Sequence, residues 1–371
     1  MSRFEVVICG GGVAGIEGAL RLRRLAGERV QLTLVCSDAS LKYRPLAVQE
    51  PFGLSGVRRY PLERIASDVG AHWVRDRLAS VEPADRRLRT ESGAELGYDA
   101  LLLAIGASEA SSCPDAQVFT DHASSEAFDQ IVRGVEAGSV EAVAFVVPHE
   151  WVWPLPLYEL ALMTAHRARS MNRSPELTFV TWEGRPLKAF GRAAGDAVVD
   201  LLREAGVRLH TGVAACVPAT GIVAFAGVEV HADWIVTLPR LTGPAIKGIS
   251  AGSRWFVPIN ERCVVPSTDG RVFAAGDVTD FPVKHGGIAA EQADTAAAGI
   301  AHLAGVADRP PPFRPVIRGV LLAGSRRVYV SARVIDGLGW ESQIHEQPPW
   351  PAQEKIVAEE LGNYLRLTYS G

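Results

Sequence analysis

The sequence has few cysteines, and no two of them are placed as a pair. Its 371 residues contain five cysteines, at positions 9, 36, 113, 216 and 263, which are odd in number, widely spaced and free of any C-x-x-C motif. This spacing argues against a disulfide framework and against a zinc site, so no metal centre is expected. It favours reduced thiols in a reducing compartment.

Long apolar runs and basic clusters are also missing. No stretch reaches the ~18 consecutive apolar residues that a membrane span needs. The formal net charge is -4 and no run of lysines or arginines occurs, so we expect no nucleic-acid partner. Arg3 is followed almost at once by the apolar residues 6–8 and by glycines, which leaves no room for a signal peptide and predicts a cytoplasmic protein.

Glycine is absent from a mid-chain stretch where a nucleotide-binding loop is expected. The pattern predicts strands at 142–147, 177–181 and 207–209 with helices from about 155 and at 192–204, which is a βαβ arrangement. The glycines of a nicotinamide site would fall near positions 148, 150 and 153, where this sequence has Pro148, Glu150 and Trp153. Proline lacks a backbone donor, the carboxylate repels a pyrophosphate and the indole fills its space. We therefore expect that NAD(P)H does not bind here in the usual way.

The polar and aromatic residues of this region allow more than one interpretation. Trp151, Trp153 and Tyr158 either line an apolar pocket or pack at a domain interface. Glu183 ends a predicted strand at the position where a dinucleotide ribose is bound, but without the glycine loop we expect it to be a solvated charge. His149 and Glu150 form a weak acid–base candidate, and a position on a surface loop is the stronger expectation.

An intact nucleotide loop stands at the other end of the sequence. The segment FEVVICGGGVAGIEGALRLRRL predicts strand, loop and helix in that order. Gly10 allows the tight turn, Gly12 lets the backbone approach a pyrophosphate, and Gly15 lets the helix pack closely on the strand. The pyrophosphate would face the helix N-terminus.

The ribose contact of this first site is less regular. The strand that begins at Val30 would normally end on an acidic residue that binds the adenosine ribose, but Cys36 occupies that position. Either Asp38, two residues later, reaches the ribose, or Cys36 is a small buried hydrophobic residue and the contact is lost.

Two later segments resemble the flavin motifs of flavoproteins with two dinucleotide-binding domains. YDALLLAIGAS resembles the second motif, with Ala104 and Gly106 at its end, and RVFAAGDVTD resembles the third, with Gly276 and Asp277. The resemblance implies the pyridine nucleotide-disulfide oxidoreductase superfamily and bound FAD. It also implies that Asp277 binds the ribityl chain and that a helix from about Gly287 and Ile288 points its N-terminus at the flavin ring. A positive helix end there would stabilise the reduced anionic ring.

Within that superfamily, LKYRPLAVQEPFG, with Arg44 and Pro45, resembles sulfide:quinone oxidoreductases and type II NADH dehydrogenases. The resemblance covers roughly residues 3 to 310. Sulfide:quinone oxidoreductases pass electrons through a pair of reactive cysteines, whereas this chain has none between Cys113 and Cys216 and none after Cys263. Sulfide chemistry through a cysteine pair is therefore not expected.

Lys284 and His285, just before the helix that faces the flavin, are the candidate catalytic residues. A lysine near the flavin could stabilise developing negative charge, and a histidine could transfer a proton at neutral pH. The alternative is a solvated lysine and a histidine that caps the helix.

The composition changes at Pro310, where RPPPFRP resembles a linker. The pattern beyond it predicts a hairpin around Gly324–Arg326 and a helix within 352–367. This helix carries both positively and negatively charged side chains, so we expect it to pack on the flavin domain or on a second subunit. At most, it would make peripheral contact with a membrane. Packing on a second subunit would form a homodimer through this C-terminal unit.

The predicted architecture is an α/β protein with two Rossmann-like, FAD/NAD(P)-binding domains, the second inserted in the first. We expect an FAD-binding domain at 1–115 and 265–310, a second domain with a degenerate loop at 116–264, and a C-terminal unit of hairpin and helix at 311–371. The predicted function is that of an FAD-dependent oxidoreductase acting on a small-molecule or quinone-type partner. The alternatives are an NAD(P)H:quinone reductase and a non-catalytic flavin-binding sensor.

Overall fold

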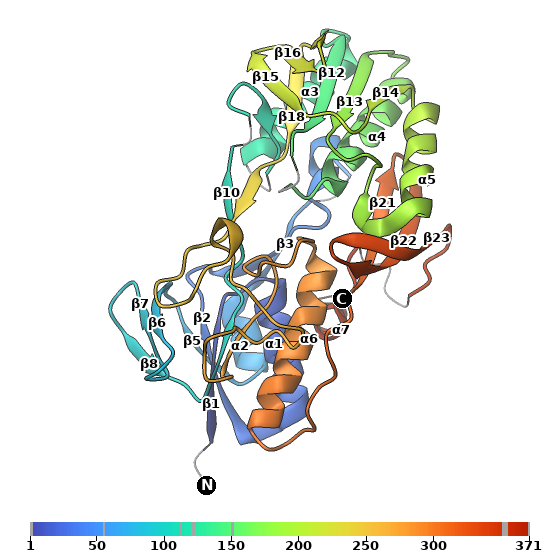
Figure 1. The fold of residues 1–371 in the computed structure, drawn as a ribbon. Helices are drawn as coiled ribbons and strands as arrows, with labels where there is room; N and C mark the ends of the chain where they lie inside the picture. Colours follow the sequence, from blue (N-terminus) through green and yellow to red (C-terminus); the bar gives the residue numbers. More distant parts are fainter. Residues whose placement is uncertain are drawn as a thin grey trace.

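The computed structural model describes residues 3–54, 56–111, 113–120, 123–149, 152–350 and 355–369, with only the backbone described for 123–126. The chain forms two units, each built on a five-stranded parallel sheet, and a smaller C-terminal sheet that packs beside the second unit (Figure 1). The predicted fold class, α/β with two Rossmann-like domains of which the second is inserted in the first, is confirmed.

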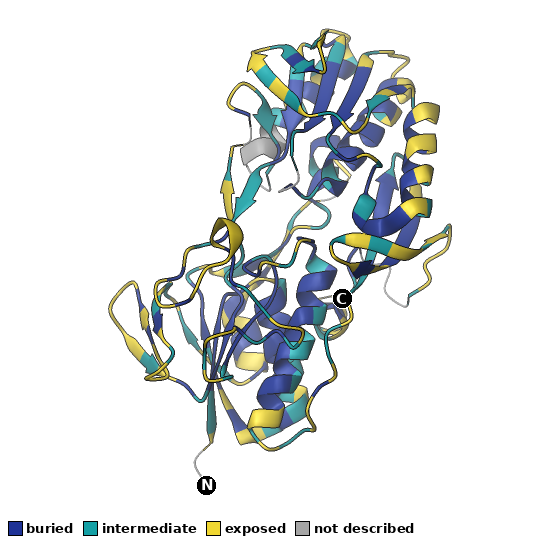
Figure 2. Cartoon of the chain, in the orientation of Figure 1, coloured by how far each residue is buried: buried dark blue, intermediate teal, exposed yellow. Residues whose placement is uncertain are grey.

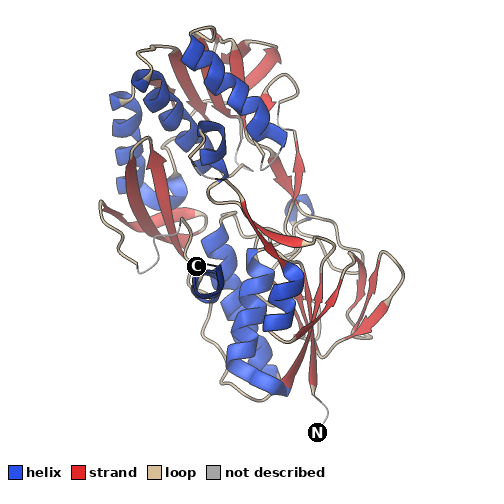
Figure 3. Ribbon diagram, turned by 180° about the vertical axis from the view of Figure 1, so that it is seen from behind, coloured by secondary structure: helices blue, strands red, loops and turns tan. Residues whose placement is uncertain are grey.

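The sheet of the first unit has the strand order β20-β9-β1-β2-β5. The strands are β1 (Phe4–Cys9), β2 (Val30–Val35), β5 (Ala71–Val74), β9 (Ala100–Leu103) and β20 (Val272–Ala274). Helices α1 (Val13–Ala26) and α6 (Gly286–Leu303) cover one face (Figure 3). Gly18 lets α1 pack closely on the sheet, because a Cβ there would lie 2.7 Å from the Leu102 side chain of β9.

Smaller elements complete the first unit. Val81 and Leu88 pack with Val7 and Cys9 into a core on the face of the main sheet opposite α1 and α6. They belong to a three-stranded antiparallel sheet of β6 (Leu78–Glu82), β7 (Arg87–Thr90) and β8 (Glu95–Gly97). A β-ribbon and a helix lie beyond β2: β3 (Ser40–Tyr43), β4 (Arg58–Pro61) and α2 (Leu62–Asp68).

The second unit repeats the parallel architecture with the order β11-β18-β12-β13-β14. Its strands are β11 (Gln117–Val118), β12 (Ala142–Val147), β13 (Glu176–Thr181), β14 (Val207–His210) and β18 (Trp234–Thr237), and its helices are α3 (Ala123–Ala137), α4 (Leu155–Ser170) and α5 (Gly191–Glu204). An antiparallel sheet of β15 (Ala215–Ala219), β16 (Ile222–Phe225) and β17 (Val228–His231) packs on it. Buried residues fill the centre of each unit (Figure 2).

Two antiparallel strands connect the units. β10 (Ser108–Ala110) leads out of the first unit and β19 (Arg240–Thr242) leads back, and they pair with each other. Ile246, Ile249 and Val257 then pack in the same core as Val7 of β1. The chain thus returns to the first unit soon after β19, earlier than the boundary that we placed at residue 264.

The C-terminal sheet has one strand more than predicted. The hairpin is present as β21 (Val316–Ala323) and β22 (Arg326–Ile335), and β23 (Leu338–His345) adds a third, antiparallel strand. The prediction missed β23 because its apolar residues do not point to a core: Leu338, Trp340 and Ile344 are all exposed.

The last helix is shorter than predicted. α7 (Glu359–Tyr369) begins later than residue 352, because Ile356 instead forms a β-bridge with Gly319. Leu361 and Leu365 of α7 are buried in the core of the first unit beside α1, in line with the preference for packing on the flavin domain. Among the described residues no helix combines the length and the apolar character needed to cross a bilayer.

Candidate cofactor and redox site

One large cavity lies where the carboxyl ends of β1, β2, β9 and β20 meet the second unit. Its volume of about 930 Å³ falls within the ~300–1,000 Å³ usual for small-molecule and cofactor sites. Most of the predicted site residues line it: Gly10, Gly12, Cys36, Asp38, Arg44, Pro45, Ala104, Gly106, Gly276, Asp277, Lys284 and His285. Gly15, Gly287 and Ile288 do not. The crevice outside the carboxyl ends of parallel strands is where open α/β sheets bind ligands.

The first glycine loop has the geometry of a phosphate site. Gly10 has φ +119°, and a Cβ on it would lie 2.1 Å from the Ala104 carbonyl oxygen. Gly12 is the N-cap residue of α1, and a Cβ there would meet nothing within 4 Å. No side chain caps this helix, and its first turn carries no acidic residue, so its free N–H groups and positive end suit an anionic group. The loop therefore fits the pyrophosphate of a dinucleotide such as FAD.

Gly15 acts behind the cavity wall. A Cβ on it would lie 1.9 Å from the carbonyl oxygen of Gly10, so only glycine lets α1 begin this close to the loop. Its role is the helix–strand packing predicted for the third glycine of the motif.

At the adenosine end, Cys36 and Asp38 both line the cavity. Cys36 is buried, and burial raises the pKa of its thiol, so the thiol stays neutral. The Asp38 side chain is 62% exposed and lies 4.0 Å from the Lys42 ammonium. Of the two, Asp38 alone offers a charged acceptor for ribose hydroxyls. Arg77 also lines this end of the cavity, although it belongs to none of the sequence motifs. Its Nε donates a hydrogen bond of 3.0 Å to Ser37 Oγ.

At the other end, Lys284 is buried rather than solvated, so that alternative was wrong. Its ammonium donates to the Asp277 carbonyl over 3.2 Å and to the Thr279 carbonyl, and it lies 3.8 Å from the centre of the Phe256 ring. Burial lowers the pKa of Lys284 to about 8, although the carboxylates of Asp277 and Asp280 oppose the shift. Burial likewise raises the pKa of Asp277.

His285 is the cap of α6, and this alternative is confirmed. Its Nδ1 accepts a hydrogen bond of 3.1 Å from the Gly287 amide, and its ring lies 5.4 Å from that of Trp153. Burial, with the nearby charge of Lys355, lowers the pKa of His285 to about 3. This pKa argues against the predicted proton transfer by His285 at neutral pH.

Gly287 and Ile288, which the resemblance places at the flavin ring, do not line the cavity. The Gly287 amide is already bonded to His285, and Ile288 is buried in the core shared with the second unit.

The aromatic segment divides between the two roles considered for it. Trp153 lines the cavity, where it also contacts Phe190 at 5.9 Å between ring centres. Tyr158 is fully buried in the second unit and stacks on Phe179 at 4.2 Å. Trp151 and Glu150, and with Glu150 the acid–base candidate that it forms with His149, lie outside the described residues.

Glu183 is not the solvated charge that we expected. Its side chain is buried and accepts hydrogen bonds from the Tyr158 hydroxyl, at 2.9 Å, and from the Lys188 amide, at 3.2 Å. Burial raises its pKa. The carboxylate that could have bound a nicotinamide-nucleotide ribose is thus already bonded within the protein. This hydrogen bond could not be predicted from the local sequence, because Tyr158 lies 25 residues away on α4.

Lys355 is a further cavity residue that the sequence did not reveal. It lines the wall near His285, and its Nζ lies 2.6 Å from Oε2 of Glu159. Glu159 is fully buried on α4, and its Oε1 accepts the Leu322 amide over 3.0 Å. The ion pair joins positions 196 residues apart, so no local motif could have indicated it.

The cysteines take no part in the flavin end of the site. All five lie in the described part of the chain, and Cys36, at the adenosine end, is the one that lines the cavity. Burial raises the pKa of Cys113, so this thiol is not activated. Within the described ranges, no group of three or more His, Cys, Asp or Glu side chains is placed to hold a metal ion.

A glycine loop on a strand–helix turn, the Gly276–Asp277 turn beside the start of α6, and an inserted second Rossmann unit are the features expected of a flavoprotein oxidoreductase with two dinucleotide-binding domains. No protein-family model matches the chain.

Two curated relatives oxidise sulfide according to their names. The mitochondrial sulfide:quinone oxidoreductase of Mus musculus is 33% identical over 108 residues, which cover 28% of this chain and 23% of that protein. The matched stretch thus spans about a quarter of the mouse protein. The sulfide-quinone reductase of Aquifex aeolicus (strain VF5) is 25% identical over 304 residues, or 75% of this chain and 69% of that protein.

The fold comparison agrees with these matches. The crystal structure of the sulfide:quinone oxidoreductase from Aquifex aeolicus superposes with a TM-score of 0.78 at 20% identity, over 92% of this chain and 87% of that one. The sequence and the fold of this chain thus resemble those of sulfide:quinone oxidoreductase, a member of the pyridine nucleotide-disulfide oxidoreductase superfamily, whose members use FAD.

The loop glycines provide a matched pair of variants. Gly10→Ala should lower the free energy of unfolding by about 2–6 kcal/mol, because it adds backbone strain and a steric clash. Gly12→Ala should cost about 1 kcal/mol or less, because its Cβ enters open space at an N-cap, but it should lower flavin content. Chemical unfolding of the apoprotein and the flavin absorbance of the purified variants check both. Equal destabilisation by the two substitutions would contradict this account of the loop.

Proposed function

We propose that the chain binds FAD in the cavity and transfers electrons between the flavin and a small, apolar, quinone-type partner. The observation that supports this most directly is the shared wall. The cavity runs from the glycine loop of the first unit to an apolar surface contributed by the second unit and the strands that join it: Phe119, Trp153, Leu155, Pro156, Leu238, Pro239 and Leu241. Such a surface suits a flat, uncharged ring system.

The residues at the first end would bind the cofactor. The open backbone at Gly12 and the N-terminus of α1 suit its pyrophosphate, and the Asp277 carboxylate suits its ribityl hydroxyls. When bound, FAD supplies reversible two-electron redox chemistry. Gly276 keeps the Asp277 turn tight with φ +81°, and its amide donates to Gln292 Oε1 over 2.8 Å.

The charged residues at the other end would stabilise negative charge and deliver a proton. Lys284 precedes α6, and both the ammonium and the helix N-terminus favour developing negative charge nearby. With a pKa of about 8, Lys284 is mostly protonated at neutral pH yet can still release its proton. Lys284 therefore replaces His285 as the candidate proton donor.

Lys355 adds a second positive charge to this wall. Glu159 fixes its position, because the short ion pair is buried and the carboxylate is held in turn by the Leu322 amide. The aromatic contact of Trp153 with His285 and Phe190 shields the same region from water.

Neither NAD(P)H nor a cysteine relay has support in this chain. Pro148 and Trp153 stand where the nicotinamide loop needs glycines, and Glu183 is already bonded to Tyr158. The sequence has no cysteine between Cys113 and Cys216 and none after Cys263, where the resemblance to sulfide:quinone oxidoreductases would place the reactive pair, and Cys113 is buried. Electrons would thus pass directly between the flavin and the redox partner.

The apolar wall is tested by a pair of tryptophan variants. Trp153 lines the cavity, whereas Trp182 lies away from it under the Lys188 ammonium. With the flavin photoreduced anaerobically, Trp153→Ala should raise about 2- to 12-fold the concentration of a soluble quinone that gives half-maximal reoxidation, since an aromatic contact is worth ~0.5–1.5 kcal/mol. Trp182→Ala should leave this concentration unchanged. Equal behaviour of the two variants would place the partner elsewhere.

The exclusion of nicotinamide nucleotides is tested directly by mixing. Anaerobic NADH or NADPH should bleach the flavin absorbance slowly and without saturation at millimolar concentrations, because the sequence at 148–153 lacks the glycines of a pyrophosphate loop. A specific site would normally saturate between about 1 μM and 1 mM. Fast, saturable bleaching would instead support a type II NADH dehydrogenase-like activity.

A further inference from the structure

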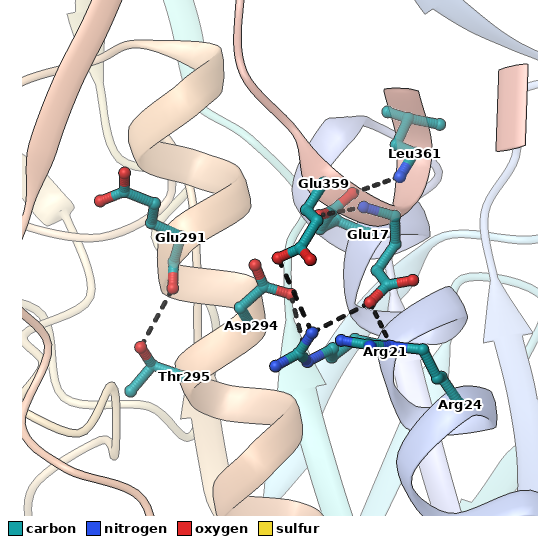
Figure 4. Close-up of polar contacts among 9 residues, drawn as sticks. Glu17, Arg21, Arg24, Glu291, Asp294, Thr295, Glu359 and Leu361 are labelled. Carbon is teal, nitrogen blue, oxygen red and sulfur yellow. Dashed lines mark hydrogen bonds and ion pairs between the residues drawn. The ribbon is translucent and has the colours of Figure 1, made fainter. Parts of the chain in front are cut away.

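Charged side chains gather where α7 meets α1 and α6 (Figure 4). We call this group the carboxylate cluster: Glu17, Arg21 and Arg24 of α1, Asp294 of α6, and Glu359 and Glu360 of α7. It contains four carboxylates and two guanidinium groups, so the carboxylates are in excess.

Glu17 takes the place of an N-cap for α7. Its side chain is buried, and its two oxygens accept the amides of Glu360, at 3.0 Å, and of Leu361, at 2.7 Å. These amides belong to the first turn of a helix, where backbone donors have no partner within the helix. The docking of α7 thus depends on a carboxyl group from another element.

The arginines offset only part of the negative charge. Glu360 Oε1 lies 3.0 Å from Arg21 Nη1 and 2.5 Å from Arg24 Nε, which makes Glu360 the best-paired carboxylate. Asp294 forms only a weak ion pair, because the guanidinium atom that it faces, Arg21 Nε, is 3.8 Å away. Asp294 Oδ1 and Arg21 Nε are both buried without a hydrogen-bond partner in the described part of the chain.

We propose that the carboxylate cluster is a pH-sensitive latch, which holds α7 on α1 and α6 while the cluster carries protons and loosens α7 when they leave. The geometry leaves Asp294 of α6 beside carboxylates of α1 and α7, with its ion-pair partner Arg21 as far as 3.8 Å away. Protonation removes a negative charge that the docked arrangement cannot neutralise.

The direction of the pH effect follows from the raised pKa values. Burial and the neighbouring carboxylates raise the pKa of Asp294 to about 8, and burial raises that of Glu17 to about 7. When α7 leaves, both groups return to water and their pKa values fall to the ordinary range. Docking is therefore strongest in mild acid and weakens as pH rises to about 8. Asp294 makes the larger contribution, because the two amides that Glu17 accepts favour its charged form.

Other contacts of α7 do not titrate in this range. Leu361 and Leu365 are buried. The Tyr364 hydroxyl donates to Asp68 of α2 over 2.8 Å, and this bond and Arg64 lower the pKa of Asp68. These contacts contribute the part of the docking free energy that does not depend on the protons of the carboxylate cluster.

The latch has a consequence for the cavity. Lys355 and Ile356 line the cavity and directly precede α7, which begins at Glu359. Release of α7 would loosen the support of both side chains. This consequence rests on the proposed function, whereas the latch itself does not.

Hydrogen–deuterium exchange of the full chain tests the latch. Exchange is followed at pH 6, 7, 8 and 9 in peptides from 359–369, with correction for the intrinsic pH dependence of amide exchange. Protection in the wild type should fall at least about tenfold from pH 6 to pH 9, because one released proton changes an equilibrium up to tenfold per pH unit. Asp294→Asn should keep its protection at pH 9. Glu28→Gln, whose side chain is 78% exposed in the first unit, should behave as the wild type.

A second variant guards against misfolding of Asp294→Asn. Glu359 is 65% exposed and 3.9 Å from Arg21, so Glu359→Gln should fold. Because it removes one of the carboxylates that raise the pKa of Asp294, it should make the loss of protection between pH 6 and pH 9 smaller than in the wild type. Protection that is independent of pH in the wild type, or an unchanged pH response in the folded Asp294→Asn or Glu359→Gln variant, would overturn the latch. Flavin content, measured on the same samples, reports separately on the proposed function.

Discussion

The cavity depends on one close approach of backbone to backbone, where the loop after β1 crosses the end of β9. A Cβ on Gly10 would meet the Ala104 carbonyl at 2.1 Å, and a Cβ on Gly15 would meet the Gly10 carbonyl at 1.9 Å. The Gly10 amide is bonded to Val35 and the Ala104 amide to Cys9, so three strand ends are fixed around the loop. This crossing places the free N-terminus of α1 at the cavity wall. The other proposed cofactor contacts depend on this position, because it is where the pyrophosphate would bind.

The second constraint is the C-terminal segment, which contacts both units. The Lys355–Glu159 ion pair attaches it to α4 of the second unit, and α7 attaches it to α1 of the first. Loss of one partner of a buried ion pair usually costs about 3–5 kcal/mol, because the other charge is left uncompensated. The cavity wall between the units is thus stabilised by a segment that is remote from the cofactor motifs in sequence. The carboxylate cluster gives that segment a sensitivity to pH.

The cofactor motifs could be recognised in the sequence because their roles are local. Gly10 and Gly276 adopt positive φ values within a few residues of the strands that precede them, so the spacing alone indicates the loop. The alternation of strands and helices in the second unit could also be predicted, although the glycines of a nucleotide loop are missing there. What the sequence could not show are contacts that close over long separations. Glu183 looked solvated because Tyr158 lies on another element, and β23 was missed because its apolar side chains face solvent.

The role of the polar residues depended on burial, which composition does not report. Lys284 and His285 were chosen for their chemistry, but the enclosure of both side chains lowers their pKa values by different amounts and so reverses their suitability for proton transfer. The end of the inserted domain, which we expected at residue 264, depends on packing in a similar way. The loop after β19 has no strong pattern, and only its packing against β1 assigns it to the first unit.

Titration of the apoprotein with FAD, followed by flavin fluorescence, tests the central claim most directly. The wild type should bind one FAD per chain, and Asp277→Ala should bind it at least about tenfold more weakly, because a hydrogen bond to a charged group contributes ~1.5–3 kcal/mol. Asp280→Ala, in the same segment but outside the cavity, should bind FAD as the wild type does. A wild type that takes up no FAD, or an Asp277→Ala variant that binds it equally well, would contradict the proposed site.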